Sequence, residues 1–309
     1  MSNVIVTGGA GFIGSHVADM LLACGHNVHV FDNLSTGKRE NIPEKAVFHE
    51  IDIRSDKLVT LIKDVCPESI VHAAAQVSVR QSMYDPPGDV DINVKGIVNL
   101  LSSCKGNKLP FMVFFSTGGA IYGEQDTFPA TEDHAIRPTS IYGLSKWVAE
   151  RYFDFWKREA AFHGSVLRLS NVYGPRQDPH GEAGVVAIFS QKLIAGKDAV
   201  IFGDGKQSRD FVFVGDVVEG VRLALENKVE GTFNIGTGIE TNVNELYSMI
   251  AGCLGVDAKP KYEPERPGEQ RRSCIDNSLA REKLSWSPKQ EIQGGLCLTA
   301  EWFKQRLRA

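Results

Sequence analysis

Residues 4–33 read VIVTGGAGFIGSHVADMLLACGHNVHVFDN, and the order of residue types in this stretch decides the fold. Residues 4–6 are all apolar, which is typical of a strand buried on both faces. Residues 8–14 then contain four glycines, and the apolar residues that follow recur at helical spacing. A second apolar run ends at Asp32. The stretch therefore predicts a strand, a glycine loop, a helix and a second strand, in that order.

The glycine loop has the chemistry of a dinucleotide site. Gly9–Gly14 fits the spacing G-x-G-x-x-G between a strand and a helix, so backbone amides can approach a pyrophosphate at the positive end of the helix. Asp32 ends the next strand, where a carboxylate binds ribose hydroxyls and repels a 2′-phosphate, and this favours NAD over NADP. Lys38 and Arg39 lie nearby and favour NADP instead. A glycine turn without a ligand is the structural alternative.

The alternation of strands and helices continues along the chain. We expect strands at 46–53, 69–75, 111–116 and 164–174, and helices at 58–66, 90–104 and 140–159. This order predicts an α/β fold with a Rossmann-type, doubly wound parallel sheet. Beyond residue 175 glycine and proline become frequent, which indicates a smaller, loop-rich domain. We therefore divide the chain into a dinucleotide-binding domain, 1–175, and a substrate-binding domain, 176–309, with the strand near 232–236 returning to the first.

Composition excludes several classes of protein. The formal net charge of −4 over 309 residues gives no reason to expect a nucleic acid or an anionic membrane as partner. No apolar run is long enough to span a bilayer, and a strand begins almost at Met1, so we expect a cytoplasmic protein without a signal peptide. The six cysteines lack metal-ligand spacing, and we interpret them as reduced packing residues: Cys24, Cys66, Cys104, Cys253, Cys274 and Cys297. No metal site is expected.

A tyrosine and a lysine lie four residues apart in the stretch YGLSK. On a helix this spacing places Tyr142 and Lys146 on one face. An ammonium close to a phenol favours the phenolate, which is a usable acid and base near neutral pH. Taken alone, the pair is weak evidence, because a core tyrosine beside a surface lysine is the more common explanation.

The segments TGGAGFIG, HAAAQ, STGGAIYG, YGLSK and RLSNVYGPR occur in the order found in one family. Along nearly its whole length the chain resembles the extended short-chain dehydrogenase/reductase family. Within that family it is most similar to the branch that epimerises nucleotide sugars at C4. The resemblance implies a bound NAD, a UDP-sugar substrate and a homodimer formed through the helices near 90–104 and 142–158, where Trp147 and Phe155 are candidate contacts.

The resemblance also implies roles for particular residues. The cofactor would be bound by the glycine loop, by the ribose and adenine region, and by the loop along the nicotinamide: Gly8, Gly11, Phe12, Ile13, Asp32, Asn33, Ser35, Thr36, Gly37, Asp52, Ile53, Ala73, Ala74, Ala75, Gln76, Asn93, Tyr142 and Lys146. The UDP-sugar would be bound by Thr117, Tyr142, Asn171, Val185, Phe202, Arg209, Arg266, Glu269 and Ser273. Two arginines from the smaller domain can neutralise a diphosphate. The catalytic residues implied are Tyr142, Lys146 and Thr117.

The stretch STGGAIYG differs from the family pattern at a position where relatives have a catalytic hydroxyl. Most relatives have a serine or threonine four residues before the tyrosine equivalent to Tyr122, where this chain has Gly118. We expect Thr117 to take over the hydroxyl's role, and the alternative is that Tyr142 acts alone. Related dehydratases and decarboxylases carry an additional acid just after this point, whereas this chain has Gly119 and Ala120.

These observations lead to an expected function. Without a second acid or base, the chemistry is limited to oxidation and reduction at one carbon, and we expect epimerisation at C4 of a UDP-hexose. UDP-glucuronate epimerisation, a net NAD-dependent reductase or dehydrogenase, and a non-catalytic dinucleotide sensor are the alternatives. Relatives with tyrosine at the position of Ser273 accept only plain hexoses, so serine predicts that 2-acetamido sugars enter as well, unless Gln76 or Arg80 fills the space.

Overall fold

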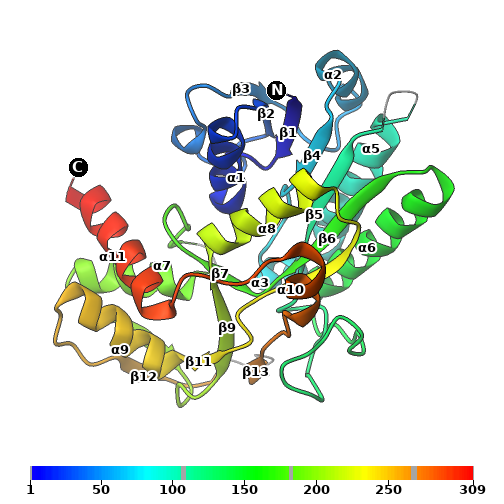
Figure 1. Cartoon of the computed structure of the whole chain (residues 1–309). Helices are drawn as coiled ribbons and strands as arrows, with labels where there is room; N and C mark the ends of the chain where they lie inside the picture. The colour runs from blue at the N-terminus through cyan, green and yellow to red at the C-terminus, as the bar shows by residue number, and fades with distance from the viewer. Residues whose placement is uncertain (1, 106–108, 181–183, 266–269, 309) are drawn as a thin grey trace.

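A computed structural model describes residues 2–105, 109–180, 184–265 and 270–308 (Figure 1). Its centre is a seven-stranded sheet in the order β10-β6-β5-β4-β1-β2-β3, in which every neighbouring pair is parallel. The strands are β1 (Asn3–Thr7), β2 (Asn27–Asp32), β3 (Val47–Glu50), β4 (Ser69–His72), β5 (Phe111–Thr117), β6 (His163–Leu169) and β10 (Gly231–Ile235). The order reverses between β1 and β4, which is the usual place for a ligand in such a sheet. The predicted α/β fold class is confirmed.

Helices cover both faces of this sheet, as Figure 1 shows. On one face the core is formed by α1 (Phe12–Ala23), α8 (Val214–Asn227) and α10 (Ser278–Leu284). On the other it is formed by α2 (Leu58–Val65), α5 (Gly96–Ser103) and α6 (Ile141–Glu159). Because both faces are covered, the central strands are mostly apolar, and all seven residues of β5 are buried.

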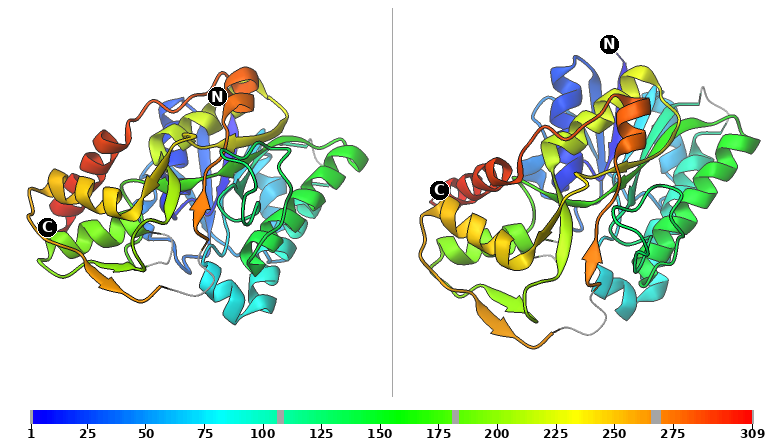
Figure 2. Two further views of the ribbon diagram at one scale, coloured as in Figure 1. Left: turned by 90° about the horizontal axis from the view of Figure 1, so that it is seen from below. Right: turned by 60° about the horizontal axis from the view of Figure 1, so that its bottom comes forward.

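A second, smaller region lies at the end of the molecule away from α5 and α6 (Figure 2). It contains a mixed sheet of β7 (Asn171–Tyr173), β9 (Ser208–Phe213), β11 (Glu240–Asn242) and β13 (Arg272–Ser273). A two-stranded sheet pairs β8 (Val200–Phe202) with β12 (Lys261–Glu263). The helices α7 (Val185–Ile194), α9 (Val243–Leu254) and α11 (Ile292–Arg308) share a separate core with this region.

The chain crosses between the two regions several times. After β7 and β9 it returns to the main sheet with α8 and β10, and after β11 and β13 it returns with α10. Because of these crossings, a single boundary near residue 175 does not assign every later segment to the smaller region. The domain boundary stays a prediction.

Two expected elements are divided in the structure. The strand expected at 164–174 is β6 followed by β7, which belong to different sheets because Ser170 bonds to Ile235 and the next residues pair with β9. The helix expected at 90–104 is α4 (Pro86–Val90), a π-helical turn at Asp91–Lys95, and α5. Such π-turns are frequent at functional sites. Two further short elements are α3 (Val79–Tyr84) and a 3-10 turn at Arg39–Asn41.

The start of α6 has a clear local cause. Ser140 is the N-cap residue, and its hydroxyl accepts a hydrogen bond from the Gly143 N–H at 3.1 Å. Lys157 and Arg158 lie in the last turn, where positive charge interacts favourably with the helix dipole. The helix that carries Tyr142 and Lys146 is therefore fixed at both ends by its own sequence.

The interpretation of all six cysteines as reduced is wrong. Cys253 in α9 and Cys297 in α11 form a disulfide, with their Cα atoms 5.0 Å apart. The two helices pack side by side in the smaller region, which brings together cysteines 44 positions apart in the sequence. Spacing along the chain could not reveal this pairing.

Asp210 connects the smaller sheet to the end of the main sheet. It lies in β9, is 1% exposed, and accepts hydrogen bonds from the Thr237 N–H at 2.8 Å, the Thr237 hydroxyl at 2.6 Å and the Gly238 N–H at 3.1 Å. These donors follow β10 directly, so one carboxylate joins the two regions.

Replacing Asp210 with alanine should lower the free energy of unfolding by about 3 kcal/mol, because buried donors lose their acceptor. Asp204→Ala is the control, since Asp204 forms an exposed ion pair with Arg271 and its loss should leave the stability nearly unchanged. Urea denaturation of both variants measures the difference. Equal stabilities for the two variants would contradict this role of Asp210.

Candidate active site

The predicted cofactor residues lie at the carboxyl edge of the main sheet. Gly8 follows β1 with a φ of 68°, and a Cβ there would lie 2.6 Å from the Ala74 backbone nitrogen. The loops after β1 and β4 therefore touch, and only glycine fits between them. The loop of Ala73, Ala74 and Ala75 is fixed by the Ala73 N–H, which donates to the Thr7 carbonyl at 3.1 Å.

Asp32 lies at the end of β2 and organises the glycine loop. One carboxylate oxygen accepts a hydrogen bond from the Ala10 N–H at 3.0 Å, and the other accepts one from the Leu34 N–H at 2.8 Å. A Cβ at Gly37 would lie 2.8 Å from this carboxylate, so the loop of Ser35 and Thr36 closes over it. Arg39 lies over the Phe48 ring at 4.6 Å, so its guanidinium already has a partner on β3.

The residues predicted for the adenine end are also connected. The Asn33 side chain donates to the Asp52 carboxylate at 2.8 Å and accepts from the Ser35 hydroxyl at 2.7 Å. The Arg54 guanidinium beside Asp52 holds the pKa of that carboxyl well below its usual range. Ile53 is buried, and its side chain packs against Gly96 of α5.

Gln76 and Asn93 are held together by a carboxylate that the sequence analysis missed. Asn93 exchanges two hydrogen bonds with the Gln76 backbone, at 2.9 and 3.1 Å. Asp89 accepts from the amides of both side chains, at 2.8 Å from Gln76 and 3.0 Å from Asn93. The spacing of Asp89 and Asn93, four residues apart in a helical segment, is the sequence signal for this cluster.

These features fit a bound dinucleotide. Among the described residues no side chain caps the N-terminus of α1, which begins with Phe12 and Ile13, and the first turn contains no acidic residue. A Cβ at Gly11 would have only the Gly8 carbonyl oxygen within 4 Å, at 3.2 Å, so its other sides are open. An open glycine cradle at an uncapped helix N-terminus suits a pyrophosphate.

Tyr142 and Lys146 face the end of β5. The Thr117 side chain lies close enough to that of Tyr142 to lower its pKa, and the Tyr142 N–H donates to the Ser82 hydroxyl at 3.0 Å. Lys146 is buried, with its ammonium 4.4 Å from the centre of the Phe114 ring. The structure thus brings together the three predicted catalytic side chains from one strand and one helix.

Burial dominates the electrostatics of the tyrosine and lysine pair. Burial raises the pKa of Tyr142, the Thr117 side chain lowers it and the Asp89 charge raises it, and together they bring it to about 12. Burial lowers the pKa of Lys146 to about 8, and the charges of Glu150 and Asp89 oppose this. Desolvation of Tyr142 therefore opposes formation of the phenolate, and the expectation that Lys146 favours the phenolate stays a prediction.

His72 is a further buried group that the sequence analysis missed. It ends β4, hydrogen-bonds to the Thr7 hydroxyl at 2.7 Å and stacks on the Phe114 ring. Burial and repulsion by Lys146 lower the pKa of His72 to about 3, so it is neutral near pH 7. It therefore adds no charge beside Lys146.

The glycine pair after Thr117 has two different causes. A Cβ at Gly118 would lie 2.7 Å from the Cδ1 atom of Ile275, so this isoleucine occupies the space that a side chain at position 118 would need. A Cβ at Gly119 would have Asn171 Oδ1 at 3.5 Å and Thr117 Oγ1 at 3.9 Å as neighbours. Gly118 therefore accommodates Ile275, and Gly119 leaves space between two predicted substrate residues.

Other predicted substrate residues lie on the smaller sheet. Arg209 in β9 is paired in register with Ser273 in β13, and Ser273 is buried. The Arg209 guanidinium donates to the Ser208 carbonyl at 2.8 Å. Val185 begins α7 and is partly buried. Arg266 and Glu269 lie outside the described residues.

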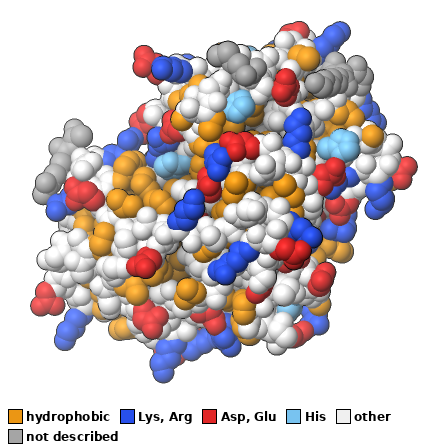
Figure 3. Space-filling model, viewed as in Figure 1, with side chains coloured by type: hydrophobic (Ala, Val, Ile, Leu, Met, Phe, Trp, Pro, Cys, Tyr) orange, Lys and Arg blue, Asp and Glu red, His pale blue; other side chains and the backbone are white. Residues whose placement is uncertain are grey.

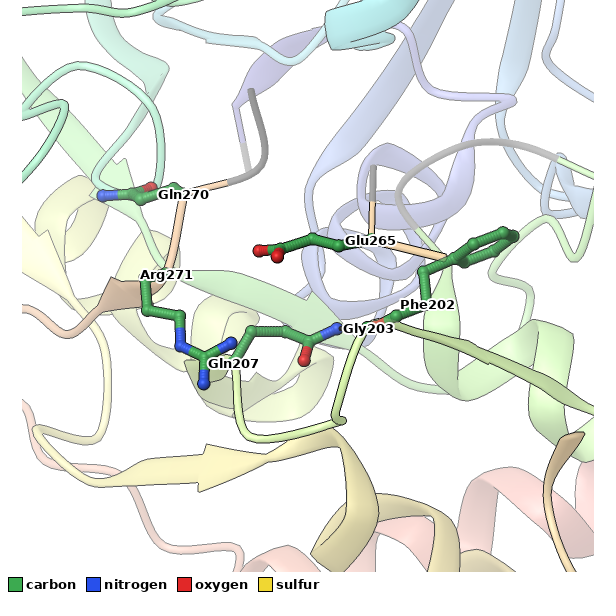
Figure 4. A pocket seen from close by; sticks show the side chains of 6 residues that line it. All are labelled: Phe202, Gly203, Gln207, Glu265, Gln270 and Arg271. Atoms are coloured by element: carbon green, nitrogen blue, oxygen red, sulfur yellow. Dashed lines mark hydrogen bonds between the residues drawn. The ribbon is translucent and has the colours of Figure 1, made fainter. Parts of the chain in front are cut away.

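Phe202 lines a small hollow shown in Figure 4. Its other walls are Gly203, Gln207, Glu265, Gln270 and Arg271, from the β8 end and the segments that flank β12 and β13. The volume of about 10 Å³ corresponds to roughly one water molecule, so the hollow alone does not accommodate a nucleotide base.

The surface and the remaining groups add little to this site. On the face drawn in Figure 3 acidic, basic and hydrophobic side chains are interspersed. Within the described ranges no helix has the length and apolarity to cross a membrane. The same ranges contain no cluster of three or more histidine, cysteine, aspartate or glutamate side chains suited to a metal ion.

The fold and the site define a dinucleotide-dependent enzyme with a tyrosine and lysine pair beside a strand-end threonine. Residues 4–236 match the model of the NAD dependent epimerase/dehydratase family, and the chain belongs to this family. Its cofactor is NAD.

Known relatives are similar to this chain over nearly its full length. The chain is 43% identical over 308 residues to the UDP-glucose 4-epimerase of Mycolicibacterium smegmatis, covering 98% of both chains. It is similar to the crystal structure of Thermotoga maritima UDP-glucose 4-epimerase with UDP-glucose, at 46% identity and a TM-score of 0.95, with 99% of both chains covered. It is also similar to Thermus thermophilus UDP-glucose 4-epimerase in complex with NAD, at 41% identity and a TM-score of 0.92, with 98% of this chain and 99% of that chain covered.

Gly118→Ser should destabilise the protein by about 1–3 kcal/mol, because the new side chain overlaps Ile275. Adding Ile275→Val removes the Cδ1 atom and should recover more than half of the loss. Gly119→Ala is the control and should change stability by less than about 0.5 kcal/mol, since that position has ordinary contacts. Thermal unfolding of the four proteins tests this, and an unaltered midpoint for Gly118→Ser would rule out the overlap.

Proposed function

We propose that the protein interconverts UDP-glucose and UDP-galactose by inverting C4 of the hexose through a 4-keto intermediate. The observation that carries the proposal is the contact of Tyr142 with Thr117, with Lys146 one helical turn away at the edge that holds the glycine cradle. Full-length relatives with this activity support it.

The roles of the residues follow from their surroundings. Tyr142 accepts the proton of the sugar 4-hydroxyl and later returns it, and Thr117 holds both oxygens through its own hydroxyl. Lys146, buried beside Phe114, supplies positive charge that favours the phenolate. When bound, NAD would supply reversible hydride transfer at the sugar carbon, and its positive nicotinamide ring would also favour the phenolate. Gly8, Gly11 and Asp32 would hold this cofactor.

The substrate would be bound mainly through its diphosphate, away from the reacting carbon. Asn171 and Arg209 lie on the smaller sheet, and we place the diphosphate between this sheet and the end of β5. Strong contacts to the diphosphate and few to the hexose leave the flat keto sugar free to turn over. Gly119 contributes no side chain to the space beside Asn171 and Thr117, which is consistent with a turning sugar.

We further propose a homodimer through α3, α4 and α6. Exposed hydrophobic side chains gather on these helices: Val79, Met83, Tyr84, Val90, Leu144, Tyr152 and Phe155, with Tyr84 85% exposed. Trp147, the other candidate contact, is only partly exposed. An apolar group of this kind is typical of an interface. Sedimentation should give twice the chain mass.

The cytoplasmic location stays a prediction. The Cys253–Cys297 disulfide weighs against it, because structural disulfides are rare in cytosolic proteins outside hyperthermophiles.

The function is tested by incubating the purified protein with UDP-galactose and no added cofactor. We expect UDP-glucose to form, and Tyr142→Phe to abolish this while retaining bound NAD and the fold, because it removes only the reacting oxygen. A requirement for added NADH would indicate a net reductase. Turnover of UDP-glucuronate alone would indicate a UDP-glucuronate epimerase. The absence of turnover with any of these sugars would indicate a binding protein. Near-normal rates for Tyr142→Phe would contradict the assigned mechanism.

Thr117→Val keeps the shape of the side chain and removes its hydroxyl. We expect kcat to fall roughly 10-fold or more, which corresponds to about 1.4 kcal/mol of transition-state stabilisation. Thr299→Val is a matched control, since Thr299 is buried in α11 and its hydroxyl donates to the Gly295 carbonyl at 2.8 Å. Unchanged kinetics for Thr117→Val would mean that Tyr142 works without a hydroxyl partner.

We further propose that the small side chain of Ser273 allows 2-acetamido sugars to bind as well. We expect the protein to interconvert UDP-N-acetylglucosamine and UDP-N-acetylgalactosamine, and Ser273→Tyr to remove this activity selectively by filling the space. Values of kcat/KM for both sugar types, with Ser273→Ala as the control, measure the effect. Loss of both activities in Ser273→Tyr, or a natural protein that rejects the acetylated sugars, would contradict this specificity.

A further inference from the structure

A row of polar side chains crosses the sheet directly beneath the site. Ser116 in β5 is paired in register with Arg168 in β6, and Arg168 with Asn234 in β10. Aligned residues on neighbouring strands point to the same face of a sheet. This is the face of α6, because Phe114 and Val166, two residues earlier on the same strands, belong to the core under that helix.

Glu150 extends from α6 to this row and is fully buried. One carboxylate oxygen accepts hydrogen bonds from the Ser116 hydroxyl at 2.5 Å and from Arg168 Nε at 3.1 Å. The other accepts from Arg168 Nη2 at 2.8 Å. A single side chain thus ties the helix to two adjacent strands, and the Arg168 charge compensates the buried carboxylate.

The far side of Arg168 fixes the turn after Thr117. Its Nη1 atom donates to the Tyr122 hydroxyl at 3.0 Å and to the Glu132 carbonyl at 3.0 Å. The Tyr122 hydroxyl donates in turn to Asn234 Oδ1 at 2.7 Å. Burial raises the pKa of Tyr122 to about 12, so this phenol remains a donor.

The network meets the catalytic side chains at two points. Glu150 lies one helical turn beyond Lys146 and two turns beyond Tyr142, while Ser116 immediately precedes Thr117. The Ser116–Glu150 bond therefore limits how far α6 can slide or tilt against the end of β5.

We propose that Glu150 and Arg168 are positioning residues, which hold Tyr142 and Lys146 of α6 opposite Thr117 through the hydroxyl of Ser116. This inference rests on the proposed epimerisation. If the unmodified protein does not interconvert UDP-glucose and UDP-galactose, the proposed function fails. If it does, the variants below test the positioning role by itself.

Ser116→Ala removes the strand-to-helix bond and leaves the Glu150–Arg168 pair intact. Ser165→Ala is the matched control, because Ser165 is buried in β6 and its hydroxyl donates to the Val229 carbonyl, away from the site. For both variants we would measure bound NAD, the midpoint of thermal unfolding, kcat and KM for UDP-galactose.

We expect Ser116→Ala to lower kcat about 5-fold or more, with KM and bound NAD within about twofold of the unmodified protein. Ser165→Ala should lose comparable stability and keep kcat within about twofold. An unchanged kcat in Ser116→Ala, or an equal fall in both variants, would overturn the proposal.

The charge of Glu150 gives a second test through the pH profile. In the described structure the titratable groups facing Lys146 are Tyr142 and Glu150 from α6, His72 from β4 and Asp89 from α4. Because the Glu150 charge raises the pKa of Lys146, removing it should move the alkaline limb of the kcat profile to lower pH.

The double variant Glu150→Gln/Arg168→Gln removes this charge without leaving a buried guanidinium unpaired. We expect its alkaline limb to shift down by about half a pH unit or more. An unshifted limb in a folded variant would overturn the electrostatic influence of Glu150 on Lys146 and with it this part of the proposal. If the double variant does not fold, the comparison of Ser116→Ala with Ser165→Ala decides.

Discussion

The ion pair between Glu150 and Arg168 is the interaction on which the arrangement of the site depends. Both side chains are buried between α6 and the sheet, where an unpaired charge would be strongly destabilising. Their hydrogen bonds to Ser116 and Tyr122 satisfy the remaining polar atoms and connect the helix, two strands and the turn after β5. Because these partners are shared, α6 has one well-defined position against the sheet. Tyr142 and Lys146 lie on this helix, so their positions relative to the sheet are fixed with it.

The chemistry is limited by the residues that follow β5. Ile275, from the segment after β13, fills the space at Gly118, and the hydroxyl from β5 that influences the Tyr142 side chain belongs to Thr117. Gly119 and Ala120 carry no acid or base. Ile275 packs with Ile121, Tyr122 and Ala130, so the segment after β13 contacts the turn that follows β5. One proton acceptor beside a nicotinamide suits oxidation and reduction at one carbon.

Much of this arrangement could be predicted from the sequence, because its signals are local. The glycine loop, the end of β2 at Asp32 and the four-residue spacing of Tyr142 and Lys146 all depend on periodicity and turn chemistry. The departure at Gly118 was also visible, although its cause was not, since Ile275 is far away in the chain. The break at Ser170 and the Cys253–Cys297 pair likewise depend on contacts between distant segments. Glu150 continues the spacing of Tyr142 and Lys146, but only the register of β5 and β6 shows its partners.

The most direct measurement of the central claim follows an isotope through one turnover. UDP-galactose labelled with deuterium at C4 is converted in ordinary water, and the unlabelled sugar is converted in deuterium oxide. A site with Tyr142 as its one acid and base predicts that UDP-glucose keeps the label at C4 and takes up no deuterium on carbon from the solvent. Loss of the C4 label, or solvent deuterium at C3 or C5, would require a second base and contradict the account.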